Sequence, residues 1–473
     1  MMEKKYIKLY QNLHKAFQGK NFIFDSMLNF AFAATIIYFI FFQLALPLWH
    51  DEIYQLWMVS KDIDSIITTT RADPNYPLQS IIYKLFYDFF GFKDFENLVV
   101  LHFLSLFIIL LSLFLLRKIF SYKKIIMLAF ILFSSEFFLR FFFELRSYGF
   151  IFSCSALFSS SYLLTKLKSD NLYCYLLYTS GLFLSALHAI AGLFVVSVML
   201  KFLFENQSLL KRFSALILIS ISCIFVLIFS SESILLNNNF HIDSYYVHIR
   251  NTGAFMIPLI VVGIFLVTGS PKHFFNQILI DISPVIFSMI IIYTYSFITS
   301  PFFQGRYFTA FFPFLSLFLI KHIDTKYFIS LKIVSLLLVI FLYGPRAISP
   351  YSNFEAIIES SHKPQCAETP LFFENQTGLD SKIIFQSEFI PIIYYTAEDY
   401  YSDIQRPILS AKDTIAWWKD NYQNNNCKVI GISIGELTQD PSSLSVEKNI
   451  ISPSRKLVDG CNKNGCGAVW VIE

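Results

Sequence analysis

The stretch "LVVLHFLSLFIILLSLFLL" at residues 98–116 is one of many apolar runs that decide the fold class. A helix crosses the hydrocarbon core of a bilayer with about 17 to 25 residues, so this run is long enough to span. Of the 473 residues, 55% are hydrophobic and only 15% are charged, which leaves too few charges to cover a soluble protein of this size. The sequence therefore predicts an α-helical polytopic membrane protein.

Similar runs predict about eleven transmembrane helices. They fall at roughly 27–46, 98–116, 125–139, 146–165, 172–187, 189–204, 213–230, 254–269, 283–299, 307–321 and 328–344. Residues 172–204 could instead form one long tilted helix, which would change the parity. Basic loops such as "RKIFSYKK" from Arg117 and "TKLKSDN" from Thr165 favour a cytoplasmic N-terminus by the positive-inside rule. We therefore expect a multi-pass protein of the bacterial inner membrane.

The composition changes after residue 345, where Pro, Asn, Ser and Asp become common and no run is long enough to span. We expect residues 1–345 to form the membrane domain and residues 346–473 a mixed α/β domain in the periplasm. Cysteines at 366, 427, 461 and 466 would form disulfides in that compartment, and "CNKNGC" suits a local bridge. Free thiols are one alternative, and a zinc site is another, although no CxxC pair is present. Cys154, Cys174 and Cys223 lie in or beside apolar spans and are interpreted as packing residues.

The stretch "LPLWHDEIYQLW" at residues 46–57 places charge where the first span leaves the membrane. It opens a long first outer loop, residues 47–96, whose amphipathic pieces suit the membrane interface. Partial desolvation there would make the carboxylate of Asp51 a stronger base. Asp51 could instead cap the next helix, with Glu52 favouring its positive end.

A second charged row lies in "SEFFLRFFFELRSYG", residues 135–149, where Glu136, Arg140 and Glu144 follow at intervals of four. That spacing predicts one helix face, with Arg146 close by. Ionisable groups at membrane depth usually face a cavity or one another, so they are candidates for function. The alternative is a structural ion pair.

Further polar residues are predicted on the same outer side. His188 lies at a turn between two predicted spans, although a lone imidazole is more often a hydrogen-bonded packing residue. Arg306 in "GRYF" opens a later span, where a guanidinium suits a lipid phosphate or snorkels to headgroups. Arg250 lies in the loop before the predicted eighth span.

Together these motifs resemble the GT-C glycosyltransferases, membrane enzymes that use polyprenyl-phosphate sugars and include protein mannosyltransferases and the aminoarabinose transferase. The resemblance rests on the Asp-Glu pair after the first span, the "PNYPLQSIIY" element, "ELRSYG", the outward histidine and "GRYF". Many relatives have His-Pro-Pro where this chain has Asn-Tyr-Pro. The role of this element in substrate binding, and with it that of Tyr76, therefore does not carry over directly from the family. The C-terminal domain and its Cys-rich end are also similar to phage-type O-antigen glucosyltransferases.

The resemblance implies an inverting transfer from an undecaprenyl-phosphate monosaccharide to an acceptor hydroxyl on a glycan or a lipid-linked glycan. Asp51 would be the general base, with Glu52 beside it and Glu144 orienting the acceptor or holding a cation. The lipid phosphate would be bound by Arg306, His188, Arg146 and Tyr307. The substrate pocket would further include His50, Trp49, Tyr76 and Arg250. A divalent cation, Mg²⁺ or Mn²⁺, would fit this chemistry, but no ligand set for it can be assigned.

Two other classes share these features. An O-antigen polymerase or ligase would use the same compartment and acceptor, but its large outer loop normally lies between late spans. A lipid-linked glycan transporter or flippase would show paired inverted halves, and the sequence has no such internal symmetry. The formal net charge of +3 is too small to indicate a nucleic-acid partner.

Overall fold

The computed structural model describes residues 23–41, 43, 55, 58–59, 61–70, 76–90, 95–168, 170–206, 208–236, 272–298 and 305–348, together with five strands in the C-terminal tail. The chain divides into two compact units. The first holds Met1–Phe42, Thr70–Tyr76 and Val100–Ile348, and the second holds Gln43–Thr69, Pro77–Val99 and Ser349–Glu473. The predicted domain boundary at residue 345 stays a prediction.

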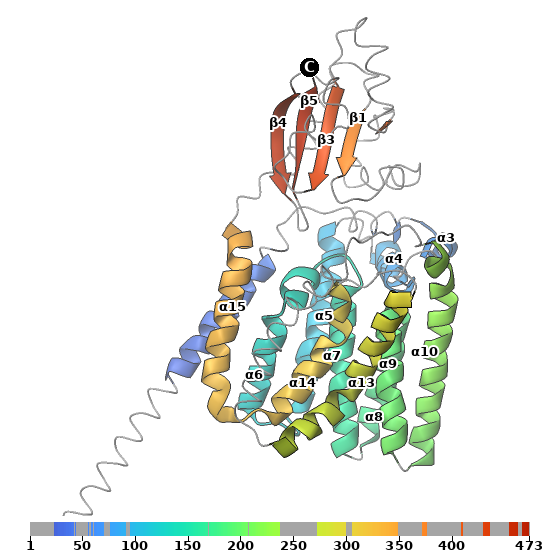
Figure 1. Cartoon of the computed structure of the whole chain (residues 1–473), viewed down its shortest axis with the longest axis vertical. Coiled ribbons are helices and arrows are strands. Elements are labelled where there is room, and N and C mark those ends of the chain that lie inside the picture. Colours follow the sequence, from blue (N-terminus) through green and yellow to red (C-terminus); the bar gives the residue numbers. More distant parts are fainter. Residues whose placement is uncertain are drawn as a thin grey trace, which may run out of the picture. The chain divides into compact units, whose positions relative to one another are not determined.

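The first unit is a bundle of helices (Figure 1). An N-terminal helix, Ile23–Phe41, precedes it in the chain. The labelled helices are α5 (Phe95–Leu116), α6 (Tyr122–Phe133), α7 (Tyr148–Leu167), α8 (Asn171–Leu187), α9 (Ala189–Glu205), α10 (Leu209–Leu236), α13 (Lys272–Ile298), α14 (Phe312–His322) and α15 (Phe328–Ile348). Short π and 3-10 turns complete it: η1 (Phe137–Phe141), η3 (Gly305–Ala310) and η4 (Thr325–Tyr327).

Several of these helices are suited to a membrane. Within the described residues, four stretches are long and apolar enough to cross one: Ile23–Phe41, Tyr148–Leu167, Leu209–Ile228 and Asn276–Thr294. The coarse prediction of a helical membrane protein is thus confirmed. The count of about eleven spans stays a prediction, and the predicted span 254–269 lies outside the described residues.

The middle of the chain forms an up-and-down arrangement of helices. Tyr162 and Lys166 near the end of α7 bind Glu205 at the end of α9, at 2.8 and 3.0 Å. Since α8 starts just after α7 ends, α8 and α9 run in opposite directions. Residues 172–204 are therefore two helices with a reversal at His188, and the single long tilted helix is excluded.

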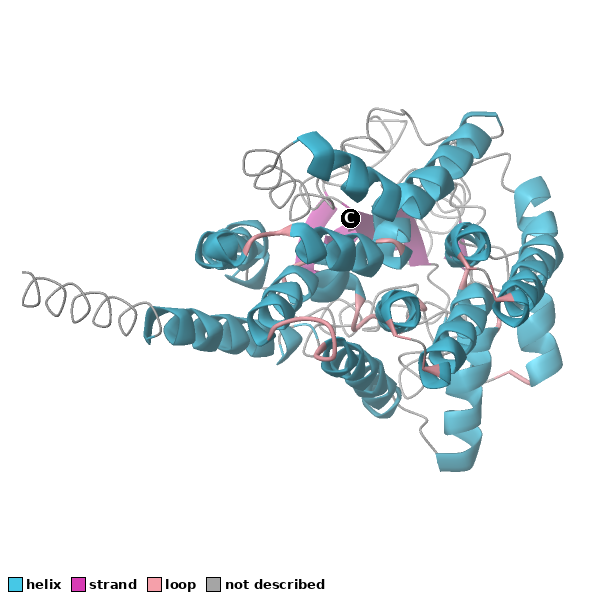
Figure 2. Cartoon of the chain, turned by 90° about the horizontal axis from the view of Figure 1, so that it is seen from below, coloured by secondary structure: helices cyan, strands magenta, loops and turns pink. Residues whose placement is uncertain are grey.

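The basic connections gather at one end of this bundle. The Lys118 ammonium lies 5.2 Å from the centre of the Tyr173 ring, which joins the end of α5 to the start of α8. The Lys124 ammonium donates to the carbonyl of Lys321 at 2.7 Å, which joins the start of α6 to the end of α14. Figure 2 views the helices from this end. These basic connections thus lie at the same end of the bundle, and the side of the membrane that this end faces stays a prediction.

The segment after α6 corrects one prediction. Glu136, Arg140 and Glu144 do not share one α-helical face, because α6 ends at Phe133 and a π turn follows. The Ser135 hydroxyl donates to the Leu132 carbonyl at 2.6 Å and accepts from the amide of Phe138 at 3.3 Å. Serine hydroxyls that compete for backbone groups in this way disfavour a regular helix.

The N-terminal helix is fastened to α15 by a buried charge. Lys332 is 3% exposed, and its ammonium donates to Asp25 at 2.6 Å and to the side-chain oxygen of Asn29 at 2.8 Å. The rings of Phe32 and Phe130 stack beside this contact. Because a charge at this depth is costly unless paired, the contact sets where the first span meets the bundle.

Cysteine burial in the bundle matches the prediction only in part. Cys154 and Cys174 are buried, as packing residues should be. Cys223 is exposed on α10, so it does not pack in the protein interior. Its helix carries a row of exposed apolar side chains, as a lipid-facing surface would.

The second unit contains two helices of the first loop, α3 (Ile63–Thr70) and α4 (Leu78–Phe90). Asp62 begins α3: its carboxylate accepts from the Ser65 amide at 2.7 Å, which holds the pKa of Asp62 below its usual value. Gln55 and Ser80 form a buried hydrogen bond of 2.9 Å. α4 buries Gln79, Ser80 and Tyr83 in its first half and exposes Leu85, Phe89 and Phe90 toward its end, so the amphipathic character expected of this loop stays a prediction.

The tail contributes a five-stranded sheet in the order β2-β1-β3-β5-β4. The strands are β1 (Leu371–Asn375), β2 (Ile408–Leu409), β3 (Val429–Gly435), β4 (Ser454–Cys461) and β5 (Cys466–Ile472). β1 pairs in parallel with β2 and β3, whereas β5 pairs antiparallel with β3 and β4. A complete α/β domain stays a prediction, because the residues between most strands lie outside those described.

Candidate functional site

His188 is placed by a sharp break in the chain. It is the single residue between α8 and α9, with an extended backbone (φ −165°, ψ 142°). Its Nδ1 accepts a hydrogen bond from the amide of Ile190 at 3.1 Å, so the ring caps the start of α9. A neutral imidazole that accepts at Nδ1 carries its proton on Nε2. His188 therefore has the form of a hydrogen-bond donor through Nε2.

Tyr307 lies against His188. Their ring centres are 5.1 Å apart with a tilt of 47°. Tyr307 belongs to η3, a tight turn that ends at Ala310, just before α14 begins at Phe312. The Ser155 hydroxyl of α7 donates to the carbonyl of Ala310 at 2.5 Å and holds this turn against the bundle. The "GRYF" motif thus meets the outward histidine, although the two lie more than a hundred residues apart in the chain.

A small cavity of about 10 Å³, enough for the centre of about one water molecule, joins these residues to a third element. Its lining is Tyr148, Ile151, His188, Ile190, Ala191, Tyr307, Thr309 and Ala310. Tyr148 is the first residue of α7, and its ring lies 5.3 Å from the guanidinium carbon of Arg146. The lining therefore gathers an imidazole, two phenols and a hydroxyl, with a guanidinium beside one of the phenols.

Two more predicted residues, Tyr76 and Glu144, are buried in the first unit. Tyr76 is 1% exposed, and its amide donates to the carbonyl of Leu187 at 3.4 Å, directly before His188. Glu144 is fully buried, and its carbonyl accepts from the amide of Arg146 at 2.6 Å. Glu144 and Arg146 thus share the short segment between η1 and α7, and the Arg146 guanidinium lies beside the ring of Tyr148, a residue of the lining.

The remaining predicted residues cannot be placed. His50, Asp51, Glu52, Trp49 and Arg250 lie outside the described residues, as does the side chain of Arg306. The roles assigned to them stay predictions. Within the described part of the chain, no group of three or more His, Cys, Asp and Glu could hold a metal ion.

The sequence analysis missed three residues near the site. Tyr148 and Thr309 line the cavity but were not assigned to it. His102 of α5 is fully buried among Phe142, Phe143 and Phe150, and it packs so closely on Gly149 that a Cβ there would lie 2.8 Å from its Nδ1. An ionisable residue inside an apolar run was the available signal for His102.

Comparison with known proteins adds no assignment. The chain matches no protein-family model, no curated protein and no solved structure. The site has to be interpreted from its own chemistry, since no relative supplies a function.

Proposed function

We propose that the protein is a membrane glycosyltransferase that moves a sugar from a polyprenyl-phosphate donor to an acceptor hydroxyl at the outer face of the inner membrane. The reaction class rests on the resemblance of the motifs to the GT-C enzymes. The donor is undecaprenyl phosphate carrying one sugar, and the acceptor is a glycan or a lipid-linked glycan.

One observation supports this proposal most strongly. His188, Tyr307 and Tyr148 come from three separate elements and line one cavity, at the bundle end opposite the basic connections. Imidazole, phenol and hydroxyl groups donate hydrogen bonds to phosphate oxygens, and Arg146 beside Tyr148 supplies positive charge. Such a group of donors suits the phosphate of a lipid-linked sugar.

The chemistry is a single displacement at the anomeric carbon. Asp51 removes the proton of the acceptor hydroxyl as that oxygen attacks, and the bond between the anomeric carbon and the phosphate oxygen breaks. The electron pair of that bond leaves with the lipid phosphate, and the anomeric configuration inverts. His188, Tyr307, Arg146 and Arg306 stabilise the negative charge that grows on the leaving phosphate.

The experiment measures donor consumption by the purified, lipid-reconstituted protein with a panel of polyprenyl-phosphate sugars. We expect Asp51→Asn to abolish transfer and His188→Ala to lower kcat by about 10² to 10³, the usual effect of losing one donor to a developing charge. Neither change should alter insertion or the melting temperature by more than a few degrees.

The matched control is Asp64→Asn, which removes an exposed carboxylate from the same loop and should leave turnover unchanged. Near wild-type turnover in Asp51→Asn would reject Asp51 as the base. If the wild-type protein consumes none of the donors in the panel, the proposed donor class is rejected. Donor lipid that crosses the membrane without being consumed would favour a transporter.

A further inference from the structure

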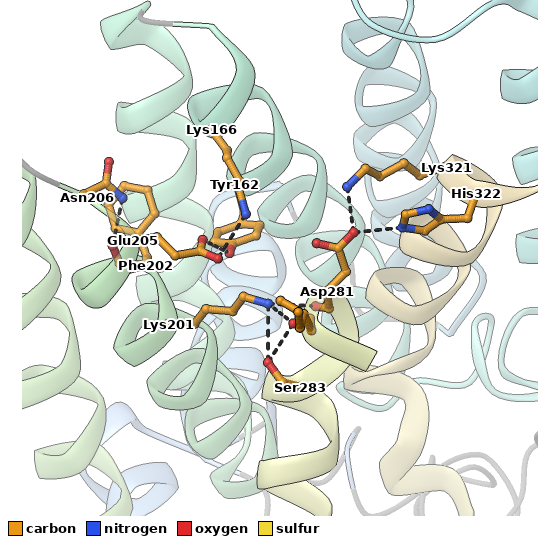
Figure 3. Close-up of polar contacts among 11 residues, drawn as sticks. Tyr162, Lys166, Lys201, Phe202, Glu205, Asn206, Asp281, Ser283, Lys321 and His322 are labelled. Carbon is orange, nitrogen blue, oxygen red and sulfur yellow. Dashed lines mark hydrogen bonds and ion pairs between the residues drawn. The ribbon is translucent and has the colours of Figure 1, made fainter. Parts of the chain in front are cut away.

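A cluster of charged residues crosses the bundle at the end opposite the cavity (Figure 3). At its centre is Asp281 of α13, whose side chain is 9% exposed. One of its carboxylate oxygens accepts from the ammonium of Lys321 at 2.6 Å and lies 2.9 Å from Nε2 of His322. Both partners lie at the end of α14, so this contact joins α13 to α14.

A second contact joins α13 to α9 at a break in its own hydrogen bonding. Pro284 lies inside α13 and has no amide hydrogen, so the carbonyl of Ile280 loses its helical partner. The hydroxyl of Ser283 donates to that carbonyl at 2.8 Å, and the Lys201 ammonium of α9 donates to it as well. Lys201 also reaches the Ser283 hydroxyl at 3.3 Å. Lys201 of α9 thus supplies a hydrogen-bond donor to the carbonyl that Pro284 leaves without one.

A third contact brings in α7. Glu205 of α9 accepts from the Tyr162 hydroxyl at 2.8 Å and from the Lys166 ammonium at 3.0 Å. Figure 3 shows this pair beside the contacts of Asp281 and Lys201. The polar groups of four helices are therefore satisfied by one another at the same level of the bundle. We call these residues, Tyr162, Lys166, Lys201, Glu205, Asp281, Ser283, Lys321 and His322, the clasp.

Three of the four helices of the clasp, α7, α9 and α14, begin at or just after residues that line the cavity. α7 starts at Tyr148 and holds Tyr162 and Lys166 near its other end. α9 is capped by His188 and holds Lys201 and Glu205, and α14 follows the turn that contains Tyr307 and ends at Lys321 and His322. A single helix therefore connects each of the three cavity residues to residues of the clasp.

Neutral contacts also join these helices, such as the hydrogen bond from Ser288 to Ser197 at 2.7 Å and the one from Ser155 to Ala310, so the clasp adds to them. The contact surfaces of the helices are rich in Phe, Leu, Ser and Ala, which also pack after a shift of one turn. Such a shift moves a helix by about 5.4 Å along its axis. The His188 and Tyr307 rings are only 5.1 Å apart, so one turn of sliding would separate them.

Within the clasp, the side chains of Asp281 and His322 are only 9% and 7% exposed, whereas those of Lys166, Glu205 and Lys321 reach the surface in part. The buried carboxylate of Asp281 opposes sliding because a shift would leave it without its partners, and fixing register is the best-attested use of such a group.

We propose that the clasp is a positioning device that fixes the axial register of α7, α9, α13 and α14 and thereby holds Tyr148, His188 and Tyr307 around the cavity. Its residues touch no substrate and act through the helices. Its effect on sugar transfer rests on the proposed function, whereas its effect on the distance between His188 and Tyr307 does not.

The test therefore reads that distance directly. The full-length chain, with its natural cysteines replaced, carries the substitutions His188→Cys and Tyr307→Cys together. The protein is oxidised in lipid, and the rate at which the two introduced cysteines form a disulfide with each other is measured. We expect Asp281→Asn and, separately, Lys201→Met to lower this rate at least tenfold at a temperature well below the melting transition. Lys123→Met is the matched control, since Lys123 is an exposed lysine at the same end of the bundle and lies outside the clasp.

An unchanged rate in both Asp281→Asn and Lys201→Met overturns the proposal. An equal fall in the rate of disulfide formation in the Lys123→Met control also overturns the proposal. If one clasp variant fails to fold, the other still decides. In the active protein, the same clasp variants should lower kcat more than they change KM. Absence of transfer by the wild-type protein would defeat the proposed function while leaving the disulfide measurement valid.

Discussion

His188 shows how a single residue combines a structural and a chemical role. Its Nδ1 caps α9, which is the packing interpretation of a lone histidine, and its ring lines the cavity beside Tyr307. The two interpretations that the sequence left open are therefore compatible. Because capping uses Nδ1, the proton stays on Nε2, where it can serve a phosphate oxygen.

Gly149 gives a test at the same scale. A Cβ at this position would lie 2.5 Å from the carbonyl oxygen of Phe142 and 2.8 Å from Nδ1 of His102. A backbone atom cannot move away cheaply, so Gly149→Ala should destabilise the protein by about 1–3 kcal/mol. The measurement is the thermal melting temperature in detergent.

The control for that change is Gly192→Ala, also within a helix. There the nearest atom to the new Cβ is Cγ2 of Val226 at 3.4 Å, and alanine favours the helix by up to about 1 kcal/mol. We expect Gly192→Ala to melt at or above the wild-type temperature. Equal melting of Gly149→Ala and the wild type would show that the segment before α7 is not packed as described.

At the scale of elements, the predictions failed where polar side chains compete with the backbone. Intervals of four between Glu136, Arg140 and Glu144 indicated one helix, but α6 ends at Phe133 and η1 follows. The hydroxyl of Ser135 accounts for part of this by binding backbone groups on both sides of the break. The reversal at His188, by contrast, was among the alternatives that the apolar pattern allowed.

The β4–β5 hairpin carries a prediction about the tail. Its register makes Cys461 and Cys466 Cα partners at the end of an antiparallel pair. Opposite residues in such a pair have Cα atoms about 4.5–5.5 Å apart, within the range of a disulfide. In protein extracted from membranes without a reductant, both residues should be alkylated only after reduction. Mass spectrometry of the C-terminal peptide would show this.

A single-cysteine control makes that measurement specific. Cys461→Ser should leave Cys466 open to alkylation without a reductant. If both residues of the native protein react with the reagent before reduction, the bridge is absent and the argument from compartment is wrong.

At the scale of the whole molecule, sidedness decides which chemistry is open to the cavity. The basic connections lie at the end of the bundle where the clasp is found, and the cavity lies at the other. If the basic end faces the cytoplasm, as the positive-inside rule requires, the cavity meets the outer leaflet and a lipid-borne donor. Nucleotide sugars of the cytoplasm would not reach it.

Labelling with a membrane-impermeant thiol reagent tests this orientation. In a chain without its natural cysteines, Lys168→Cys places an exposed thiol at the basic end, and Asp64→Cys places one in the first loop. We expect Asp64→Cys to react in spheroplasts and Lys168→Cys to react only after the membrane is opened. The reverse pattern would put the cavity in the cytoplasm and end the proposed mechanism.

The amino-acid sequence was sufficient for properties that depend on local composition. Long apolar runs predict helices in a membrane, because transfer free energies act residue by residue, and the placement of basic residues predicts an orientation that stays a prediction. It also pointed to His188, Tyr307, Arg146 and Glu144 as polar residues in an apolar setting. The tertiary structure alone decided that His188, Tyr307 and Tyr148 share one cavity, and that Asp281, Lys201 and Glu205 form one clasp. Those groupings depend on how helices far apart in the chain pack and slide against one another, which no local pattern of residues encodes.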